Sequence, residues 1–289
     1  MTDGFGPLLR LRVEQFAPVL CGVDANLARI AAAQADAAAD GVDLVVTPEL
    51  SLTGYDVRDA VHRLASPESD APYPALCDGP DAVVGTIERD PAFVPYNAML
   101  HLRGGRVLHR HRKVYLPTYG MFDEGRYFGR GDTVRAYDAG GGWRVGLLVC
   151  EDLWHPSLVW LLAAQGAHLI VVQSAAAGRG AVAGGANGGR FASWDAWEHL
   201  ARAAAIAYGC YVALANRVGV EGSFFFAGGS MIIGPDGAVL ARGADGEEDR
   251  VDAELSLEAV AAARRPYAHA RDDDPRLVAR ELARILDGR

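Results

Sequence analysis

The chain has 289 residues, of which half are hydrophobic and 22% are charged, a composition that is ordinary for a globular protein with a substantial core. Its formal net charge of −9 argues against a nucleic-acid partner, because such proteins present cationic surfaces to phosphates. No apolar run approaches the roughly 18 residues that a membrane helix needs, and the first residues lack the features of a secretory signal. We therefore expect a cytoplasmic protein with no membrane partner.

The four cysteines predict neither a disulfide framework nor a structural metal site. Cys21, Cys77, Cys150 and Cys210 are scattered and form no C-x-x-C pair, whereas paired spacing is typical of zinc sites. We expect no metal and no cofactor. The one basic cluster, residues 106–113, alternates with apolar residues as a half-exposed strand does, which favours a solvated face over a binding patch.

The first half of the chain predicts strands interleaved with helices. Strands are expected at residues 8–16, 42–47, 82–88, 96–103 and 106–114, and helices at 26–39 and 57–65. Gly104 and Gly105 predict a tight hairpin turn between the last two strands. Two stretches are expected to be loops, 66–80 because it is rich in Pro, Ser and Asp, and 115–132 because it is dense in aromatics and glycine. A loop as long as the second is usually functional.

In the second half, an apolar run ends at Cys150 and the alternation continues. We expect helices at 156–165 and at 193–208, the latter with Ser193 as cap and Gly209 as stop, and strands at 168–173, 211–216, 230–233 and 238–242. A loop of small residues covers 175–189, and the tail 255–289 is expected to be mostly helical. No repeat or linker is visible, which favours a single domain over 1–289. Strands that alternate with helices and also form hairpins indicate an α/β fold of mixed sheets with helices outside.

Three chemically complementary residues follow predicted strands: Glu49, Lys113 and Cys150. Each has a plain structural interpretation when taken singly, as a turn carboxylate, a surface cation and a buried apolar filler. Together they supply what amide hydrolysis by a thiol requires, namely a base, a cation for the developing oxyanion and a nucleophile.

The blocks that carry these residues resemble those of the nitrilase, or carbon–nitrogen hydrolase, superfamily. The blocks are residues 48–55 (PELSLTGY), 111–117 (HRKVYLP) and 149–154 (VCEDLW), and the resemblance spans about residues 8–245. Within the superfamily, the chain most resembles the glutamine-amidotransferase domain of glutamine-dependent NAD synthetases, through residues 116–120 (LPTYG) and through Ser174 before a Gly/Arg-containing loop.

This resemblance implies a four-layer αββα sandwich and a Glu-Lys-Cys triad. It implies that Cys150 is the nucleophile, Glu49 the general base and Lys113 the oxyanion stabiliser, joined by the backbone N–H of Glu151. Glu124 matches a second glutamate that orients the lysine. The residues that fall where the NAD-synthetase domain lines its substrate pocket are Tyr55, Tyr119, Glu151 and Ser174. The resemblance also implies a homodimer or larger homo-oligomer, for which the helical tail is a candidate exchange element.

Two departures bear on the function. The chain ends at Arg289 with no Ser-Gly-Gly-x-Asp-Ser motif for adenylating a carboxylate, so we expect it not to be a complete NAD synthetase. Residues 219–226 are apolar and aromatic where the glutaminase domain is more polar. We therefore expect an amidase that releases ammonia from a small linear carboxamide through a cysteine thioester. The alternatives are a glutaminase subunit that serves a separate synthetase, a nitrilase, and a nitrilase-fold regulatory or scaffold protein without turnover.

Several other residues are weighed as site candidates. His155 is next to the cysteine in sequence, but adjacent side chains seldom point the same way, so we do not expect it to be catalytic. Trp154 is expected to be pocket wall or core. Arg179 and Arg190 are candidates for binding a substrate carboxylate, and residues 224–226 (FFF) are expected to serve packing or subunit contact.

Overall fold

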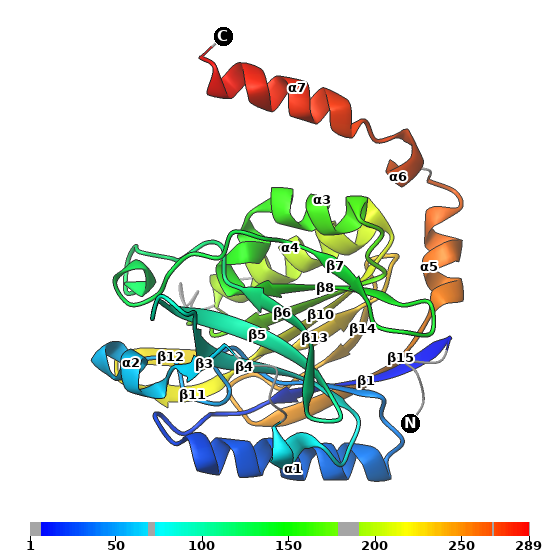
Figure 1. Cartoon of the computed structure of the whole chain (residues 1–289). Coiled ribbons are helices and arrows are strands. Elements are labelled where there is room, and N and C mark those ends of the chain that lie inside the picture. The colour runs from blue at the N-terminus through cyan, green and yellow to red at the C-terminus, as the bar shows by residue number, and fades with distance from the viewer. Residues whose placement is uncertain (1–6, 69–72, 179–190, 268, 289) are drawn as a thin grey trace.

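The computed structural model describes residues 7–68, 73–178, 191–267 and 269–288. Two mixed sheets lie face to face, with helices on the outer face of each (Figure 1). The layers follow the order helix, sheet, sheet, helix, which confirms the predicted αββα sandwich. The largest cluster of buried apolar side chains joins the two sheets, with contributions from Leu11 and Val46 in the first and from Leu147, Val171 and Val212 in the second.

The first sheet has seven strands in the order β15-β1-β2-β4-β5-β6, with β3 paired to β4. Their bounds are β1 Leu8–Gln15, β2 Leu44–Val46, β3 Ser66–Pro67, β4 Asp81–Arg89, β5 Pro95–Arg103, β6 Arg106–Arg112 and β15 Asp249–Ser256. Gly104 and Gly105 join β5 to β6 with φ angles of 53° and 71°. Two successive positive φ angles match the predicted tight hairpin, since they suit the twist of the flanking strands.

The second sheet has six strands in the order β14-β13-β10-β9-β8-β7, and a separate hairpin joins β11 to β12. Their bounds are β7 Ala136–Asp138, β8 Arg144–Val149, β9 Leu169–Ser174, β10 Tyr211–Asn216, β11 Val218–Glu221, β12 Phe224–Ala227, β13 Met231–Ile233 and β14 Val239–Arg242. The strands β8, β9 and β10 are parallel neighbours. Their carboxyl ends therefore meet at one edge, where functional groups of α/β sheets commonly gather.

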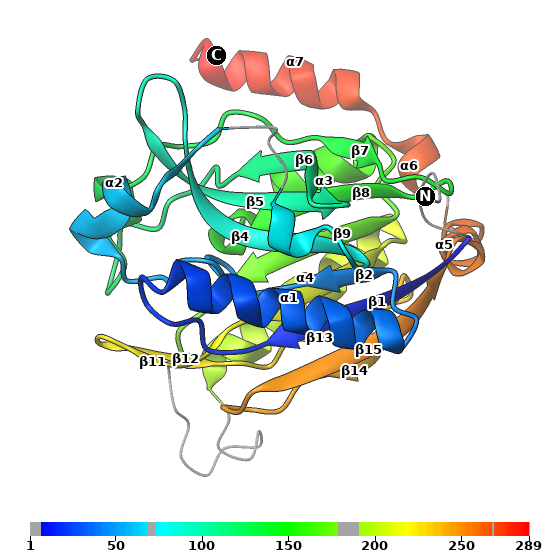
Figure 2. The same ribbon diagram turned by 60° about the horizontal axis from the view of Figure 1, so that its bottom comes forward.

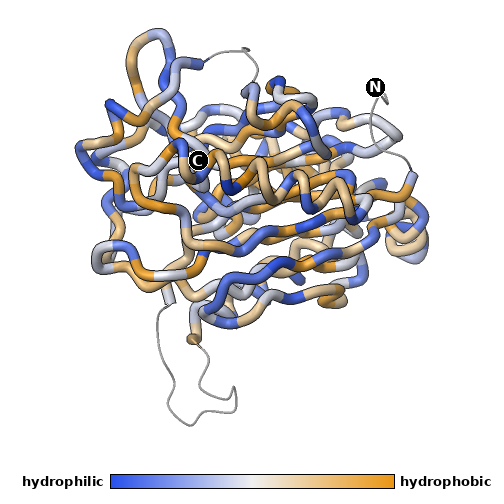
Figure 3. Tube along the Cα trace, turned by 90° about the horizontal axis from the view of Figure 1, so that it is seen from below, coloured by the Kyte–Doolittle hydropathy of each residue, from blue (hydrophilic) through white to orange (hydrophobic). Residues whose placement is uncertain are grey.

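Helix α1 (Val23–Ala39) covers the first sheet, and α3 (Pro156–Ala164) and α4 (Ala192–Tyr208) cover the second (Figures 1 and 2). The buried residues of α1 are Asn26, Ile30, Gln34 and Ala37, a spacing that gives a helix one inward face. In Figure 3, hydrophobic and hydrophilic residues accordingly mix along this helix. The remaining helices are α2 Val61–Leu64, α5 Leu257–Arg264, α6 His269–Asp272 and α7 Pro275–Leu286. No helix in the described ranges could cross a membrane.

The structure corrects two expectations about single elements and adds one strand that was not expected. The helix expected at 57–65 is a 3₁₀ turn, Arg58–Ala60, followed by the four residues of α2. Ser193 does not cap α4, because the helix begins at Ala192 and the Ser193 hydroxyl donates instead to the carbonyl of Ala177. The tail from residue 255 is mostly helical as expected, with α5, α6 and α7. The strand β15 just before it was not expected, although it pairs along the whole of β1, because its many exposed charged residues hid it in the sequence.

Candidate active site

The three predicted functional residues all follow strands closely. Glu49 lies three residues after β2, Lys113 directly after β6, and Cys150 directly after β8. The Nζ of Lys113 lies 2.8 Å from Oε1 of Glu49 and 2.7 Å from Oε1 of Glu124. The side chains of Lys113 and Glu49 are completely buried. One ammonium is therefore shared by two carboxylates in the interior, a geometry in which the attraction is little weakened by water.

Further hydrogen bonds fix both carboxylates in place. Oε1 of Glu49 also accepts from Nδ2 of Asn97 at 2.7 Å, and its Oε2 accepts from the backbone N–H of Ala175 at 2.7 Å. Oε1 of Glu124 accepts from the hydroxyl of Tyr55 at 2.6 Å. Because Ala175 follows β9, the Glu49 carboxylate connects the first sheet to the second. Asn97 was not among the residues expected at the site.

Cys150 has a backbone conformation that L-residues seldom adopt. Its φ angle is 48°, in the left-handed region, at the turn from β8 into the 3₁₀ helix Cys150–Trp154. Such strain costs on the order of 1–3 kcal/mol and is concentrated at functional sites. The side chain is 7% exposed, and the hydroxyl of Ser174 donates to its sulfur at 3.5 Å. The turn thus holds the thiol at the carboxyl ends of β8 and β9.

The charges of these groups act on one another. Burial raises the pKa of the Cys150 thiol; Glu49 adds to this effect and Lys113 opposes it. Burial works to lower the pKa of Lys113, but the attraction of Glu124 and Glu49 outweighs it and the pKa is raised. Burial raises the pKa of Glu124 to about 7, although Lys113 opposes the change. The resting site therefore contains a protonated thiol and an ammonium ion.

Gly85 in β4 lets the segment after Glu49 approach the sheets closely. A Cβ at this position would lie 2.4 Å from the backbone nitrogen of Leu50 and 2.9 Å from Oε1 of Gln173. Leu50 itself has a φ angle of 50°. A glycine is required here because any side chain would displace the backbone that positions Glu49.

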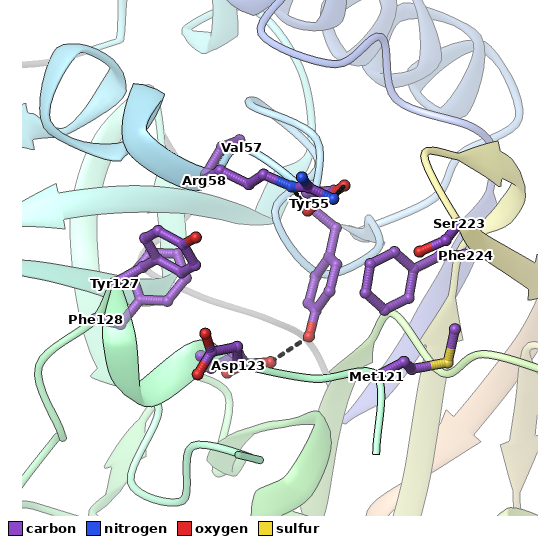
Figure 4. Close-up of a pocket in the computed structure, with 11 residues that line it drawn as sticks. Tyr55, Val57, Arg58, Met121, Asp123, Tyr127, Phe128, Ser223 and Phe224 are labelled. Carbon is purple, nitrogen blue, oxygen red and sulfur yellow. Dashed lines mark hydrogen bonds and ion pairs between the residues drawn. The ribbon is translucent and has the colours of Figure 1, made fainter. Parts of the chain in front are cut away.

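A cavity of about 280 Å³ lies beside Tyr55 and Glu124 (Figure 4). The ring of Tyr55 packs edge-on against Phe224 and Phe226, with centroids 5.4 and 5.7 Å apart. This packing accounts for Phe224 and Phe226, whereas Phe225 is 40% exposed and its ring lies against Phe191. The other carboxylate oxygen of Glu124, Oε2, is buried and has no hydrogen-bond partner among the described residues.

The residues expected to line a substrate pocket do not form one group. Tyr55 lines the cavity in Figure 4, whereas Tyr119 and Glu151 are hydrogen-bonded to each other at 2.8 Å and line a second, more open cavity of about 540 Å³. Ser174 lies against Cys150 and lines neither of them. His155 lines the second cavity, with its ring stacked on Tyr115 at 3.3 Å.

The remaining site candidates are a tryptophan after Cys150 and two arginines. Trp154 is 40% exposed and its ring meets Trp197 edge-on, so it is not a core residue, and it lines neither of the two cavities described above. Arg179 and Arg190, considered as carboxylate-binding residues, lie outside the described residues.

Sequence reasoning missed two buried polar pairs next to the site. His111 contacts Asp152, and Arg217 forms an ion pair with Glu221 at 2.8 Å. A signal for the first pair exists in the sequence, because His111 stands two residues before Lys113 on a strand. Residues two apart share a face of the sheet, so an inward-facing lysine implies an inward-facing histidine.

The architecture and the family both identify the class of protein. Two mixed sheets between helical layers, with polar groups gathered at strand ends, are the nitrilase-like fold. Residues 10–265 match the family model of carbon–nitrogen hydrolases, and the chain belongs to this family.

The similar proteins include glutamine-dependent NAD synthetases and an amidase. The chain is 31% identical to the glutamine-dependent NAD(+) synthetase of Thermotoga maritima over 263 residues, which cover 86% of this chain and 42% of that protein. A solved glutamine-dependent NAD+ synthetase of Acinetobacter baumannii superposes with a TM-score of 0.76 at 21% identity, over 88% of this chain and 46% of that one. A solved amidase of Nesterenkonia sp. superposes with a TM-score of 0.75 at 24% identity, over 94% of this chain and 95% of that one. The chain spans less than half the length of the curated relatives it matches.

Proposed function

We propose that the protein is a thiol-dependent amidase that hydrolyses the C–N bond of a small linear carboxamide and releases ammonia. The observation that carries this proposal is the buried cluster of Glu49, Lys113 and Glu124 at the strand end where Cys150 adopts its strained turn. A site of this composition can deprotonate a thiol, stabilise an oxyanion and return a proton to a leaving group.

In the first half of the reaction, Glu49 takes the proton of the Cys150 thiol as the sulfur attacks the amide carbon. The raised pKa of the thiol favours proton transfer that accompanies attack over a standing thiolate. Glu49 then gives the proton to the departing nitrogen, and ammonia leaves behind a thioester. In the second half, Glu49 deprotonates a water molecule that attacks the thioester, and the proton returns to the sulfur as the acid leaves.

Lys113 stabilises the negative oxygen in both halves. Its ammonium has three N–H donors, of which two are directed to Glu49 and Glu124. The third remains for the substrate oxygen, and the backbone N–H of Glu151 is the second proposed donor. Loss of a single such donor typically raises the barrier by about 3–4 kcal/mol. Tyr55, Tyr119, Glu151 and Ser174 are proposed to contact the substrate around this centre.

The test is a screen of ammonia release across carboxamides, carbamoyl amino acids and nitriles. Cys150→Ala is expected to abolish release and to leave the fold intact. Cys210→Ala provides the matched control, because Cys210 is also a buried free cysteine. Wild-type release by the Cys150→Ala variant would refute the assignment of the nucleophile. If every substrate class is left unhydrolysed by the wild-type protein, a scaffold role replaces the amidase proposal.

The comparisons favour a second candidate, a glutaminase that delivers ammonia to a synthetase. Relatives that match this chain are glutamine-dependent NAD synthetases. Glutamine is therefore one arm of the screen, measured with and without a candidate synthetase. Release from glutamine that increases with the synthetase supports this candidate, whereas efficient release from simple carboxamides alone excludes it.

We also propose a homodimer or larger homo-oligomer that uses the C-terminal helix. In Figure 1, α7 extends away from the sandwich, and it has no buried residue although Leu282, Ile285 and Leu286 are each more than half exposed. An amphipathic helix with an uncovered apolar face is marginal on its own. Light scattering of the full chain should give a multiple of the monomer mass, and ending the chain at Asp273 should reduce it. A monomeric full chain would refute this proposal.

A further inference from the structure

The buried carboxylate of Asp152 accepts four hydrogen bonds. Its Oδ1 accepts from the backbone N–H groups of Val114 and Tyr115, at 3.0 and 2.9 Å. Its Oδ2 accepts from the backbone N–H of Val149 at 3.1 Å and contacts Nε2 of His111 at 2.8 Å. The Asp152 side chain is completely buried and that of His111 is 2% exposed.

These donors flank the two groups that must meet for the proposed reaction. Val114 and Tyr115 directly follow Lys113, and His111 precedes it by two residues, whereas Val149 directly precedes Cys150. Lys113 follows a strand of the first sheet and Cys150 follows a strand of the second. The distance between the two side chains therefore depends on contacts between the sheets. The Asp152 carboxylate is bonded to both segments at once.

A carboxylate fills this position well. It offers acceptors on both oxygens and donates nothing, which suits two donors at Oδ1 and two at Oδ2. An asparagine has the same shape, but its NH₂ group would face at least one backbone N–H in either orientation. A buried donor left without an acceptor is unfavourable, and the local backbone has to move to relieve it.

We propose that Asp152, supported by His111, is a positioning residue that holds the Lys113 ammonium in register with the Cys150 sulfur. This inference rests on the proposed function for its kinetic consequence and on the hydrogen bonds for its geometry. Asp152 acts through the backbone on either side of the reacting groups and touches no substrate. A displacement of about 1 Å between reacting groups can reduce a rate by about 100-fold.

The kinetic test compares Asp152→Asn with a matched pair elsewhere in the fold. Asp81 is buried and contacts Nε2 of His101 at 2.9 Å, and His101 lies four residues along β5 from Asn97, or about 13 Å at the usual rise per residue. Asp152→Asn should lower kcat about 100-fold with KM within about threefold, whereas Asp81→Asn should lower thermal stability and leave kcat unchanged. Equal kcat in folded Asp152→Asn and wild type would overturn the proposal.

A second measurement requires no substrate. Iodoacetamide alkylation of Cys150, followed by peptide mass spectrometry over a range of pH, reports how well Lys113 stabilises the thiolate. In Asp152→Asn the midpoint should move to higher pH, while alkylation of the partly exposed Cys21 should stay the same. If Asp152→Asn does not fold, the same measurement is made on His111→Phe, in which a smaller shift of the midpoint to higher pH is expected. An unshifted midpoint overturns the positioning role, whereas a shift in a protein that hydrolyses no amide refutes only the proposed function.

Discussion

Replacement of Lys113 by methionine should destabilise the fold strongly, in a manner that depends on pH. The substitution keeps the volume of the side chain and removes the charge. Glu49 and Glu124 then remain as two buried carboxylates with no cation between them. Removing one partner of a buried ion pair typically costs about 3–5 kcal/mol in the free energy of unfolding, and we expect a loss in that range at pH 8.

The pH dependence follows from the carboxylates. With Lys113 in place, burial already raises the pKa of Glu124 to about 7, and without the ammonium it rises further. A carboxyl group whose folded pKa exceeds its unfolded value binds a proton more readily in the folded state. The folded variant is therefore favoured at low pH and loses stability as the pH rises through the folded pKa. The deficit relative to wild type should be smaller at pH 5.5 than at pH 8.

Urea unfolding at the two pH values measures this deficit. The control is the double variant Lys113→Met/Glu124→Gln, which removes one of the uncompensated carboxylates and should regain part of the loss at pH 8. A deficit below about 1 kcal/mol at pH 8, with no dependence on pH, would refute the view that the buried ammonium compensates these two groups.

Three other perturbations test neighbouring features. Arg217→Met leaves the Glu221 carboxylate buried without its cation and should lower the unfolding free energy by about 3 kcal/mol in urea titrations. Gly85→Ala places a Cβ 2.4 Å from a backbone nitrogen and should cost about 1–3 kcal/mol and lower the rate of ammonia release. His109, stacked on Tyr137 at 4.0 Å, has its pKa lowered to about 4 by burial. Its contribution to stability is present above about pH 6.5 and is lost as the pH falls toward 4. The melting temperature of His109→Phe should therefore decline less than that of wild type over this range.

Each of these has a result that would contradict it. Wild-type stability of Arg217→Met would mean that Glu221 needs no cation, and wild-type activity of Gly85→Ala would mean that the segment after Glu49 tolerates displacement. If the melting temperatures of His109→Phe and wild type fall by the same amount between pH 6.5 and 4, His109 titrates alike in the folded and unfolded chains.

Most of the fold could be predicted from the sequence because its strands and helices carry clear periodic patterns. The exceptions have physical reasons. β15 carries Asp249, Arg250, Asp252 and Glu254 on a sheet edge, where exposed positions take charges freely. The short strand β7 and the hairpin of β11 and β12 are too brief for a period of two to be recognised.

The candidate site was predicted in part. Glu49, Lys113 and Glu124 could be placed together because each lies in a segment that resembles the nitrilase superfamily, and in the structure Lys113 contacts both carboxylates. Asn97 and Asp152 could not, because their roles depend on register between strands and on backbone donors far away in the sequence. The role of Cys150 stays a prediction, as do the four proposed substrate contacts, since a pocket's shape depends on how loops pack.

Trapping an acyl group on Cys150 would test the proposed thioester intermediate. A carboxamide identified in the ammonia screen is mixed with the wild-type protein under single-turnover conditions, and the reaction is quenched with acid at a series of early times for peptide mass spectrometry. At the earliest times the peptide containing Cys150 should gain the mass of the acyl group, with one ammonia released for each adduct. Ammonia release in the first turnover with no adduct at Cys150 at any quench time, or with the adduct on another cysteine, would contradict the proposed nucleophile.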